Sequence, residues 1–167
     1  DGGNGASGIP VTVDVSGMPT EFRQFLSVDL GGRRIIKKKS SGKVYCWGDD
    51  TNGLIGNDGT DSGPHSTPVG IDDSSWSPRM VKKVVTGLNH ACVLLTDGSI
   101  YCWGQNGLGQ LGTGSTGATQ FTPVAVTGTQ DYVDITAGEN HVCAIKAFGN
   151  VYCWGEGVNG QLGVGWT

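Results

Sequence analysis

The tetrapeptide Tyr-Cys-Trp-Gly occurs three times in this chain of 167 residues, at 45–48, 101–104 and 152–155. The cysteines of the first two copies are 56 residues apart, and those of the last two are 51 apart. Self-similarity at a period of this order is the signature of solenoids, propellers and other repeat arrays. The chain is therefore expected to contain three copies of one small unit, each packed against its neighbour.

Other features recur in the same order around each tetrapeptide. Two glycines follow the tryptophan of every tetrapeptide, six and nine residues downstream. Gly-x-Asn-His-x-Cys precedes the second and third copies, at 87–92 and 138–143. A β-branched residue followed by Pro-Val occurs once per unit, at 9–11, 67–69 and 122–124. These matches divide the chain into a divergent repeat 1 (1–58), repeat 2 (59–114) and repeat 3 (115–167), which together make one domain.

Each repeat contains a predicted β-hairpin whose register follows from its turn. The turns have the length of a three-residue loop with glycine in the left-handed position, which fixes the residues that face each other across the hairpin. The turns and the pairs they predict are Thr96-Asp97-Gly98 with Cys92 opposite Cys102, Ala147-Phe148-Gly149 with Cys143 opposite Cys153, and Ser40-Ser41-Gly42 with Ile36 opposite Cys46.

The hairpin strands are apolar on both faces, so each small sheet should be covered on both sides. Sheets stacked face to face at a period near 50 residues describe propeller blades, whereas a parallel β-helix has a shorter rung and leucine-rich repeats lack these hairpins. The predicted fold class is all-β, with β-propeller blades of four-stranded antiparallel sheets and three repeats present.

The combined pattern resembles the regulator-of-chromosome-condensation repeat: Gly-x-Asn-His-x-Cys, a glycine turn, Val/Ile-Tyr-Cys-Trp-Gly and Gly-Gln-Leu-Gly-x-Gly. The best copies are 87–114 and 138–165, and the first repeat matches weakly. The resemblance implies a β-propeller, usually of seven blades in that family. The version that carries these cysteines is similar to a secreted bacterial branch that includes a β-lactamase inhibitory protein, rather than to the nuclear exchange factor.

Three blades are too few to close a propeller, which takes about four to eight. The chain is therefore expected to be a piece of a longer polypeptide, or a subunit that joins other copies through its end blades. The expected partners include further blades of the same polypeptide or other copies of the chain. The sequence begins and ends at nearly the same position within the repeat, which suits either arrangement. Of the two, we favour a piece of a longer polypeptide.

The facing cysteines predict two disulfides, Cys92–Cys102 and Cys143–Cys153, because directly opposed residues on antiparallel strands lie within disulfide range. Disulfides imply an oxidising compartment. The alternatives are buried thiols in a cytosolic propeller, or a metal site that uses His90 with Cys92 and Cys102 and lacks a fourth ligand. Cys46 is left as an unpaired thiol, either buried or forming an intermolecular link, and its apolar neighbours favour burial.

A basic cluster stands out because it contains no acidic residue. It could bind an acidic protein, a polysaccharide or nucleic acid. The alternatives are a solvated loop, an edge strand whose lysines deter further pairing, or an error in the sequence assigned to the segment. Its members are Arg33, Arg34, Lys37, Lys38, Lys39 and Lys43.

The overall charge of −4 and the sequence pI near 5.2 make nucleic acid an improbable partner. No apolar run approaches the roughly 18 residues of a membrane span, so membrane insertion is not expected. The two Gly-x-Gly-x-x-Gly matches follow Trp-Gly rather than open a helix, and no nucleophile elbow, zinc-protease or phosphate-loop motif occurs. We therefore expect no enzyme activity, catalytic residue, cofactor or metal.

The sequence thus predicts a non-enzymatic, extracellular or cell-surface module for binding, adhesion or assembly, which contacts a protein or polysaccharide through its loops. Two alternatives stay open at this stage. One is a structural subunit that polymerises by blade stacking. The other is an intracellular regulator that promotes guanine-nucleotide exchange or binds chromatin, for which the cysteines should be reduced.

Overall fold

The computed structural model describes residues 25–31, 34–39, 43–59 and 63–165, with side chains from residue 43 onward. Every regular element in the described part of the chain is a β-strand, so the predicted all-β class is confirmed. No described helix is long and apolar enough to cross a membrane. The first sheet contains, in spatial order, β1 (Phe25–Gly31), β2 (Arg34–Lys39), β3 (Val44–Gly48) and β4 (His65–Gly70).

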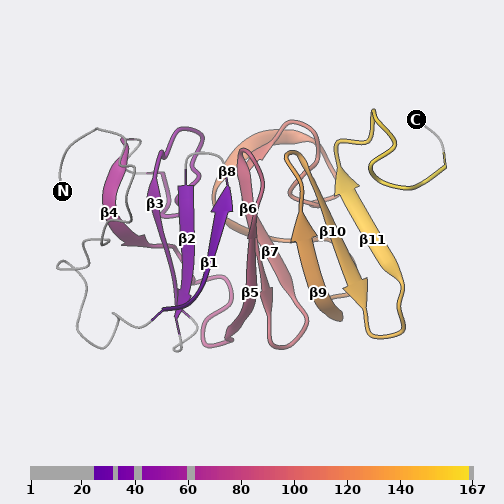
Figure 1. The fold of residues 1–167 in the computed structure, drawn as a ribbon, viewed down its shortest axis with the longest axis horizontal. Helices are drawn as coiled ribbons and strands as arrows, with labels where there is room; N and C mark the ends of the chain where they lie inside the picture. The colour runs from indigo at the N-terminus through magenta and orange to yellow at the C-terminus, as the bar shows by residue number, and fades with distance from the viewer. Residues whose placement is uncertain (1–24, 32–33, 40–42, 60–62, 166–167) are drawn as a thin grey trace, which may run out of the picture.

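The second and third sheets repeat this antiparallel meander. The second contains β5 (Val81–Thr86), β6 (His90–Leu95), β7 (Ile100–Asn106) and β8 (Gly117–Ala125). The third contains β9 (Tyr132–Ala137), β10 (His141–Lys146) and β11 (Val151–Gly155), and its order ends at β11. Figure 1 shows the three sheets side by side along the long axis of the molecule.

The predicted hairpin registers are confirmed in all three sheets. Cys92 faces Cys102 and Cys143 faces Cys153, while Ile36 faces Cys46. The register is set locally, since Gly98 and Gly149 take the left-handed φ values of 87° and 88° that a three-residue loop requires.

The sheets do not coincide with the sequence repeats, because each fourth strand lies beyond the repeat that supplies the first three. β4 and β8 carry the Thr-Pro-Val triplets at 67–69 and 122–124, and they complete the sheets of repeats 1 and 2 from within repeats 2 and 3. The repeat boundaries 1–58, 59–114 and 115–167 therefore cut each complete sheet between its third and fourth strands.

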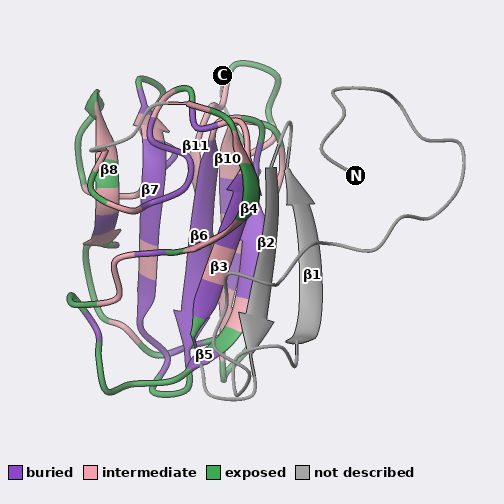
Figure 2. Cartoon of the chain, turned by 90° about the vertical axis from the view of Figure 1, so that its left-hand side faces the viewer, coloured by how far each residue is buried: buried purple, intermediate pink, exposed green. Residues whose placement is uncertain are grey.

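Two hydrophobic layers join the three sheets. The first lies between sheets one and two and includes Cys46, Val84, Val93 and Trp103. The second lies between sheets two and three and includes Cys92, Cys102, Leu111 and Val142. Every side chain of β6 is buried because β6 has a sheet on both faces, whereas β10 is buried only at alternate positions. Figure 2 shows this central burial from the end of the stack.

Candidate functional site

The loops that follow β3, β7 and β11 all lie at the same end of the strands, which we call the loop end (Figure 1). Two of them are braced by a buried side chain in equivalent positions. Asp50 accepts a hydrogen bond from the Ile55 amide at 2.8 Å, and Asn106 accepts one from the Leu111 amide at 3.2 Å. Gly157 occupies this position in the third repeat. These buried acceptors hold the loops in a compact shape.

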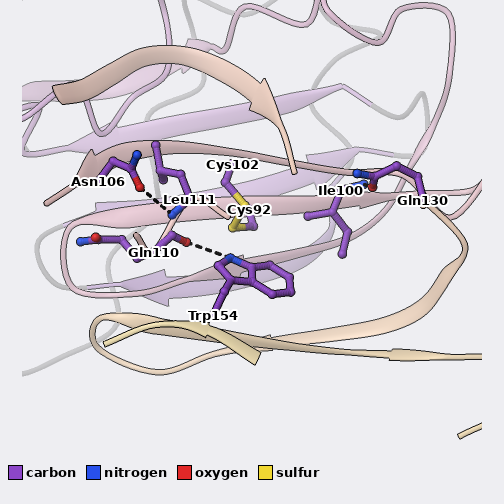
Figure 3. The surroundings of a disulfide bond; sticks show 8 residues. All are labelled: Cys92, Ile100, Cys102, Asn106, Gln110, Leu111, Gln130 and Trp154. Atoms are coloured by element: carbon purple, nitrogen blue, oxygen red, sulfur yellow. Dashed lines mark hydrogen bonds between the residues drawn. A yellow bond between two sulfur atoms is a disulfide. The ribbon is translucent and has the colours of Figure 1, made fainter. Parts of the chain in front are cut away.

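Each braced loop also receives the tryptophan of the next sheet. The indole of Trp103 donates to the Leu54 carbonyl at 3.0 Å, and the indole of Trp154 donates to the Gln110 carbonyl at 3.1 Å. Figure 3 shows the second contact beside the Cys92–Cys102 disulfide. The ring lies so close to the loop that a Cβ at Gly112 would be 2.8 Å from the Trp154 nitrogen. The glycines nine residues after Trp47 and Trp103, namely Gly56 and Gly112, are thus a packing requirement between blades.

The Gly-x-Asn-His motif is a second structural device at the loop end. The buried imidazole of His90 lies directly on Gly87, where a Cβ would be 2.0 Å from the ring. The carbonyls of Asn89 and Asn140 accept hydrogen bonds from the Gln105 and Glu156 amides, at 2.7 and 2.9 Å. In sheets two and three these contacts join the start of the second strand to the end of the third, which favours a structural role for His90 and His141.

The described loops at the loop end carry carboxylates and no lysine or arginine, although β2 begins at this end with Arg34. The carboxylates in the loops 49–59, 87–89, 107–116, 138–140 and 156–165 belong to Asp49, Asp50, Asp58, Glu139 and Glu156. Lys43, Arg79, Lys82, Lys83 and Lys146 all lie at the opposite ends of their strands or in the connections there. The opposite end also carries Asp72, Asp73, Asp97, Asp131 and Asp134, so its charges are mixed, whereas those of the described loops at the loop end are negative.

The carboxylate oxygens of Asp49 and Asp50 in the 49–58 loop are engaged by other groups of the protein. Asp49 accepts from the Thr51 amide at 2.8 Å, and the buried Asp50 carboxylate holds the Ile55 amide while lying 3.7 Å from His65 Nε2. No cluster of three metal-ligating side chains occurs among the described residues.

Two disulfides link the hairpins of sheets two and three. The sulfur atoms of Cys92 and Cys102 are 2.14 Å apart, and those of Cys143 and Cys153 are 2.09 Å apart. The first pair is fully buried in the second hydrophobic layer, while the second pair lies on the half-buried outward face of sheet three. Cys46 lies outside both bonds and is fully buried in the first layer, at the position equivalent to Cys102.

This difference in burial predicts the order in which the disulfides are reduced. An attacking thiolate must reach a sulfur atom, so Cys143–Cys153 should react at least about tenfold faster than Cys92–Cys102 in native protein. Mild dithiothreitol treatment, quenching with N-ethylmaleimide and peptide mass spectrometry measure both rates. Equal rates, or faster reduction of the Cys92 pair, would contradict the layer arrangement.

The basic cluster lies mostly on β2. Arg34 faces Gly31 and Gly48, and Lys37 faces Val28 and Tyr45, so β2 is paired on both sides. The expected solvated loop and edge strand are therefore both wrong for residues 34–39. Arg33 lies outside the described residues, as do the side chains of Arg34, Lys37, Lys38 and Lys39. The exposed Lys43 side chain pairs with Asp73, and the partner-binding role of the cluster stays a prediction.

Sheets two and three are also joined at their inner strands by an ion pair. Lys83 on β5 donates to Asp134 on β9 at 2.8 Å. This bond, together with the Ile135 amide, lowers the pKa of the Asp134 carboxyl below its ordinary value. Both side chains are substantially exposed, so the pair contributes about 0.5 kcal/mol.

The Asp134→Asn variant is therefore expected to be less stable than the parent protein by about 0.5 kcal/mol at neutral pH. Because the folded pKa is lowered, this stabilisation is complete above the ordinary carboxyl pKa and disappears as pH falls through the folded value. Urea unfolding of both proteins at pH 7 and pH 2.5 measures the change. Lys83→Gln should cause a similar loss at pH 7, and a difference that persists in acid would contradict the ion-pair explanation.

Comparison with known proteins places these features in a family. Sequence models of the regulator of chromosome condensation (RCC1) repeat match residues 41–94 and 97–145, and a second model of the same repeat matches 81–110 and 132–161. The chain is 34% identical over 140 residues to the ultraviolet-B receptor UVR8 of Arabidopsis thaliana, which covers 83% of the chain and 31% of that protein. It is 33% identical over 138 residues to the human E3 ubiquitin-protein ligase HERC2, covering 81% of the chain and 3% of the ligase.

Solved structures agree with the sequence relatives. Prp20p of Saccharomyces cerevisiae superposes with a TM-score of 0.72 at 27% identity, over 86% of the chain and 35% of that protein. The same yeast protein bound to Kap60 gives a TM-score of 0.73 at 25% identity, over 86% of the chain and 34% of the other. The chain thus spans about a third of the plant receptor and of the yeast protein.

Proposed function

Since the chain belongs to the regulator of chromosome condensation (RCC1) repeat family, we propose that it is part of a non-enzymatic propeller that binds a macromolecular partner in an oxidising compartment. The two cross-strand disulfides at equivalent positions of adjacent blades are the observation that carries the proposal. Thiols in the cytosol are kept reduced, so two such bonds fit a secreted or cell-surface protein best. Bacterial origin belongs to the same proposal and comes from the resemblance of the cysteine-bearing repeats.

Binding as the activity is supported by what the related structures contain. The structure of Prp20p was described together with its binding to Gsp1p and histones, and a second structure holds the same protein bound to Kap60. These are properties of the yeast protein, of which this chain spans about a third. They support a protein as the partner here, with a polysaccharide as the second class of ligand.

The loop end is the surface on which we place the contact. Its compact loops are held by buried acceptors and by the indoles of the next sheet, so they present fixed backbone and polar groups. Its described loops carry only carboxylates as charged side chains, with Arg34 at the start of β2 the one described cation at this end, which favours a positively charged partner and disfavours nucleic acid. The 33–43 basic cluster is a second predicted contact, for an acidic partner.

A non-enzymatic role is supported by the structural contacts that the buried titratable side chains make within the fold. His90 packs on a glycine inside the fold, and Asp50 braces a loop. HERC2 bears the name of an enzyme, but this chain covers 3% of it, so the name carries no activity to these residues.

Assembly by blade stacking is a second candidate, favoured by the outward face of sheet three. Val151 is 63% exposed on β11, whereas the equivalent Ile100 of sheet two is fully buried in the layer between sheets two and three. An apolar blade face of this kind is normally covered by another blade.

Differential alkylation of the protein in its native source tests the proposal. N-ethylmaleimide is added before lysis and is kept present while the protein is denatured. Iodoacetamide is added after reduction, and the labelled peptides are identified by mass spectrometry. We expect maleimide on Cys46 alone after denaturation, with Cys92, Cys102, Cys143 and Cys153 protected until reduction. Maleimide on all five cysteines would overturn the oxidising compartment and favour the intracellular regulator. Cys46 peptides that are cross-linked without reduction would instead support assembly through a covalent link.

A further inference from the structure

The ring of Tyr101, in the tetrapeptide of sheet two, is covered by the connection that enters its sheet. Trp76 is buried in the first hydrophobic layer and lies tilted against this ring, with the two ring centroids 5.3 Å apart. The Arg79 guanidinium lies 5.4 Å from the ring centroid and donates to the Tyr101 hydroxyl at 2.8 Å. Both residues belong to the connection 71–80 between β4 and β5. This connection therefore supplies the aromatic and cationic partners of the tyrosine.

The connection into sheet three, residues 126–131, is four residues shorter than the connection 71–80. The two connections begin alike, because the amide of their first residue donates to the residue before the preceding tetrapeptide tyrosine, at 3.0 and 3.3 Å. The shorter one contains no aromatic residue, and its Gln130 turns toward sheet two, where the side chain accepts from the Ile100 amide at 2.8 Å. It therefore supplies no ring in the place of Trp76.

Tyr152, the equivalent tyrosine of sheet three, is 45% exposed. Tyr132 lies edge-on to it, with ring centroids 6.0 Å apart, and the Lys146 ammonium lies 5.1 Å from both centroids. The two rings line a hollow between sheets two and three together with Val126 and Thr127. We call this set of four residues the tyrosine hollow. It presents aromatic rings at the position where an indole fills the preceding layer.

The tip of the sheet-three hairpin also differs from its counterpart. In sheet two, Arg79 donates to Asp97 at the hairpin tip, at 3.3 Å. The same turn position in sheet three is Phe148, which is 97% exposed. The turns match in conformation, since Gly98 and Gly149 have φ values of 87° and 88°. The Asp97 side chain keeps 42% of its surface exposed although sheet three packs beside it, so exposure is a property of this turn position within the stack.

We propose that the tyrosine hollow and Phe148 together bind a short segment of a protein partner, with an aromatic ring on Tyr152 and an apolar side chain three positions later against Phe148. The spacing is that of Trp76 and Arg79, which cover the equivalent places in sheet two. A ring is favoured at the first position because neighbouring aromatic rings attract one another edge-to-face or offset. An apolar residue replaces the arginine at the second position because the hairpin tip carries phenylalanine instead of aspartate. This contact lies at the strand ends opposite the loop end, so it is a binding surface in addition to the loop end.

Two capped tetrapeptides, Trp-Ser-Pro-Leu and Trp-Ser-Pro-Arg, probe the site, and the second has the sequence of residues 76–79. In nuclear magnetic resonance titrations of the full chain we expect saturable shifts of the Tyr132 and Tyr152 signals. The leucine peptide should bind at least about threefold more tightly than the arginine peptide. Ala-Ser-Pro-Leu, which lacks the ring, should bind at least about tenfold more weakly than Trp-Ser-Pro-Leu.

Variants at the two contact points test the arrangement. Phe148→Asp gives the hairpin tip the residue of sheet two, so the arginine peptide should become the tighter ligand by about threefold. Thr127→Trp should fill the hollow and weaken both peptides at least about tenfold. Thr127→Ser keeps the hydroxyl that donates to the Gly112 carbonyl at 2.6 Å and should leave binding unchanged.

Both substituted residues are exposed, so neither change is expected to unfold the protein. An unchanged preference for the leucine peptide in Phe148→Asp, or equal binding of the peptide without the ring, would overturn the proposal. The loop end and the cysteines take no part in the experiment, so its failure would leave the proposed function intact.

Discussion

Replacement of Trp103 by alanine is expected to lower the free energy of unfolding by about 3–5 kcal/mol. The indole is fully buried in the layer between sheets one and two, so the substitution leaves a large cavity that the surrounding strands cannot fill. It also removes the donor to the Leu54 carbonyl, which is buried with its loop. Both losses fall on one contact between blades.

Urea unfolding followed by far-ultraviolet circular dichroism measures this effect. Trp103→Phe separates the two causes, because it keeps most of the ring volume and should cost about 1–2 kcal/mol for the orphaned carbonyl and the smaller ring. Trp154→Ala is the matched control, with the same hydrogen bond in a half-buried position, and should cost clearly less than Trp103→Ala. Equal losses at the two sites would contradict the greater burial of Trp103 in its layer.

The second large effect is expected at Gly104, the last residue of the middle tetrapeptide. Its φ of 100° is unfavourable for a residue with a side chain, and a Cβ would lie 2.5 Å from the Asn89 carbonyl oxygen and 2.9 Å from the His90 Cα. Both neighbours are backbone atoms of the adjoining strand, so neither can rotate away. Gly104→Ala should cost about 3 kcal/mol, from the strained φ and the displaced strand.

Gly107→Ala is the control for this substitution, since Gly107 lies three residues further along the chain and has no atom within 4 Å of the added Cβ. It should change stability by less than about 0.5 kcal/mol. Thermal unfolding of the two variants beside the parent protein gives the comparison. A Gly104→Ala protein as stable as Gly107→Ala would mean that the Asn89 contact is absent in solution.

The local part of the fold could be predicted from the sequence. The turn at Thr96-Asp97-Gly98 sets the pairing of Cys92 with Cys102 within a few residues, so the register needs no knowledge of the rest of the molecule. The repeat period and the apolar strands indicate stacked blades, and the family match confirms both the resemblance to the RCC1 repeat and the propeller class.

The contacts between repeats could not be predicted in the same way. Nothing near Thr122-Pro123-Val124 shows that this triplet closes the sheet of the preceding repeat, because the pairing depends on the path of the chain over the loop end. The partner of each indole, a loop carbonyl 44 or 49 residues away, is equally non-local. The glycines nine residues after Trp47 and Trp103 are the available signal, since they mark where the next sheet comes close.

The basic segment shows where local reasoning failed. Three consecutive lysines argue against a central strand, because alternate side chains point to opposite faces. Pairing with β1 and β3 nevertheless places residues 34–39 in the interior of their sheet. The hairpin register imposed by the repeat therefore outweighs the local charge pattern.

Native-state hydrogen exchange tests most directly that the chain is a stack of three blades with an open outer strand. Stacking on both faces predicts that the β6 amides of Cys92, Val93 and Leu94 exchange only through global unfolding. The β10 amides of Cys143 and Ala144 should exchange about 10–100 times faster, and β11 faster still. Equal protection of β6 and β10 would contradict the stack, because both strands are paired on either side and differ only in the sheet that covers β6.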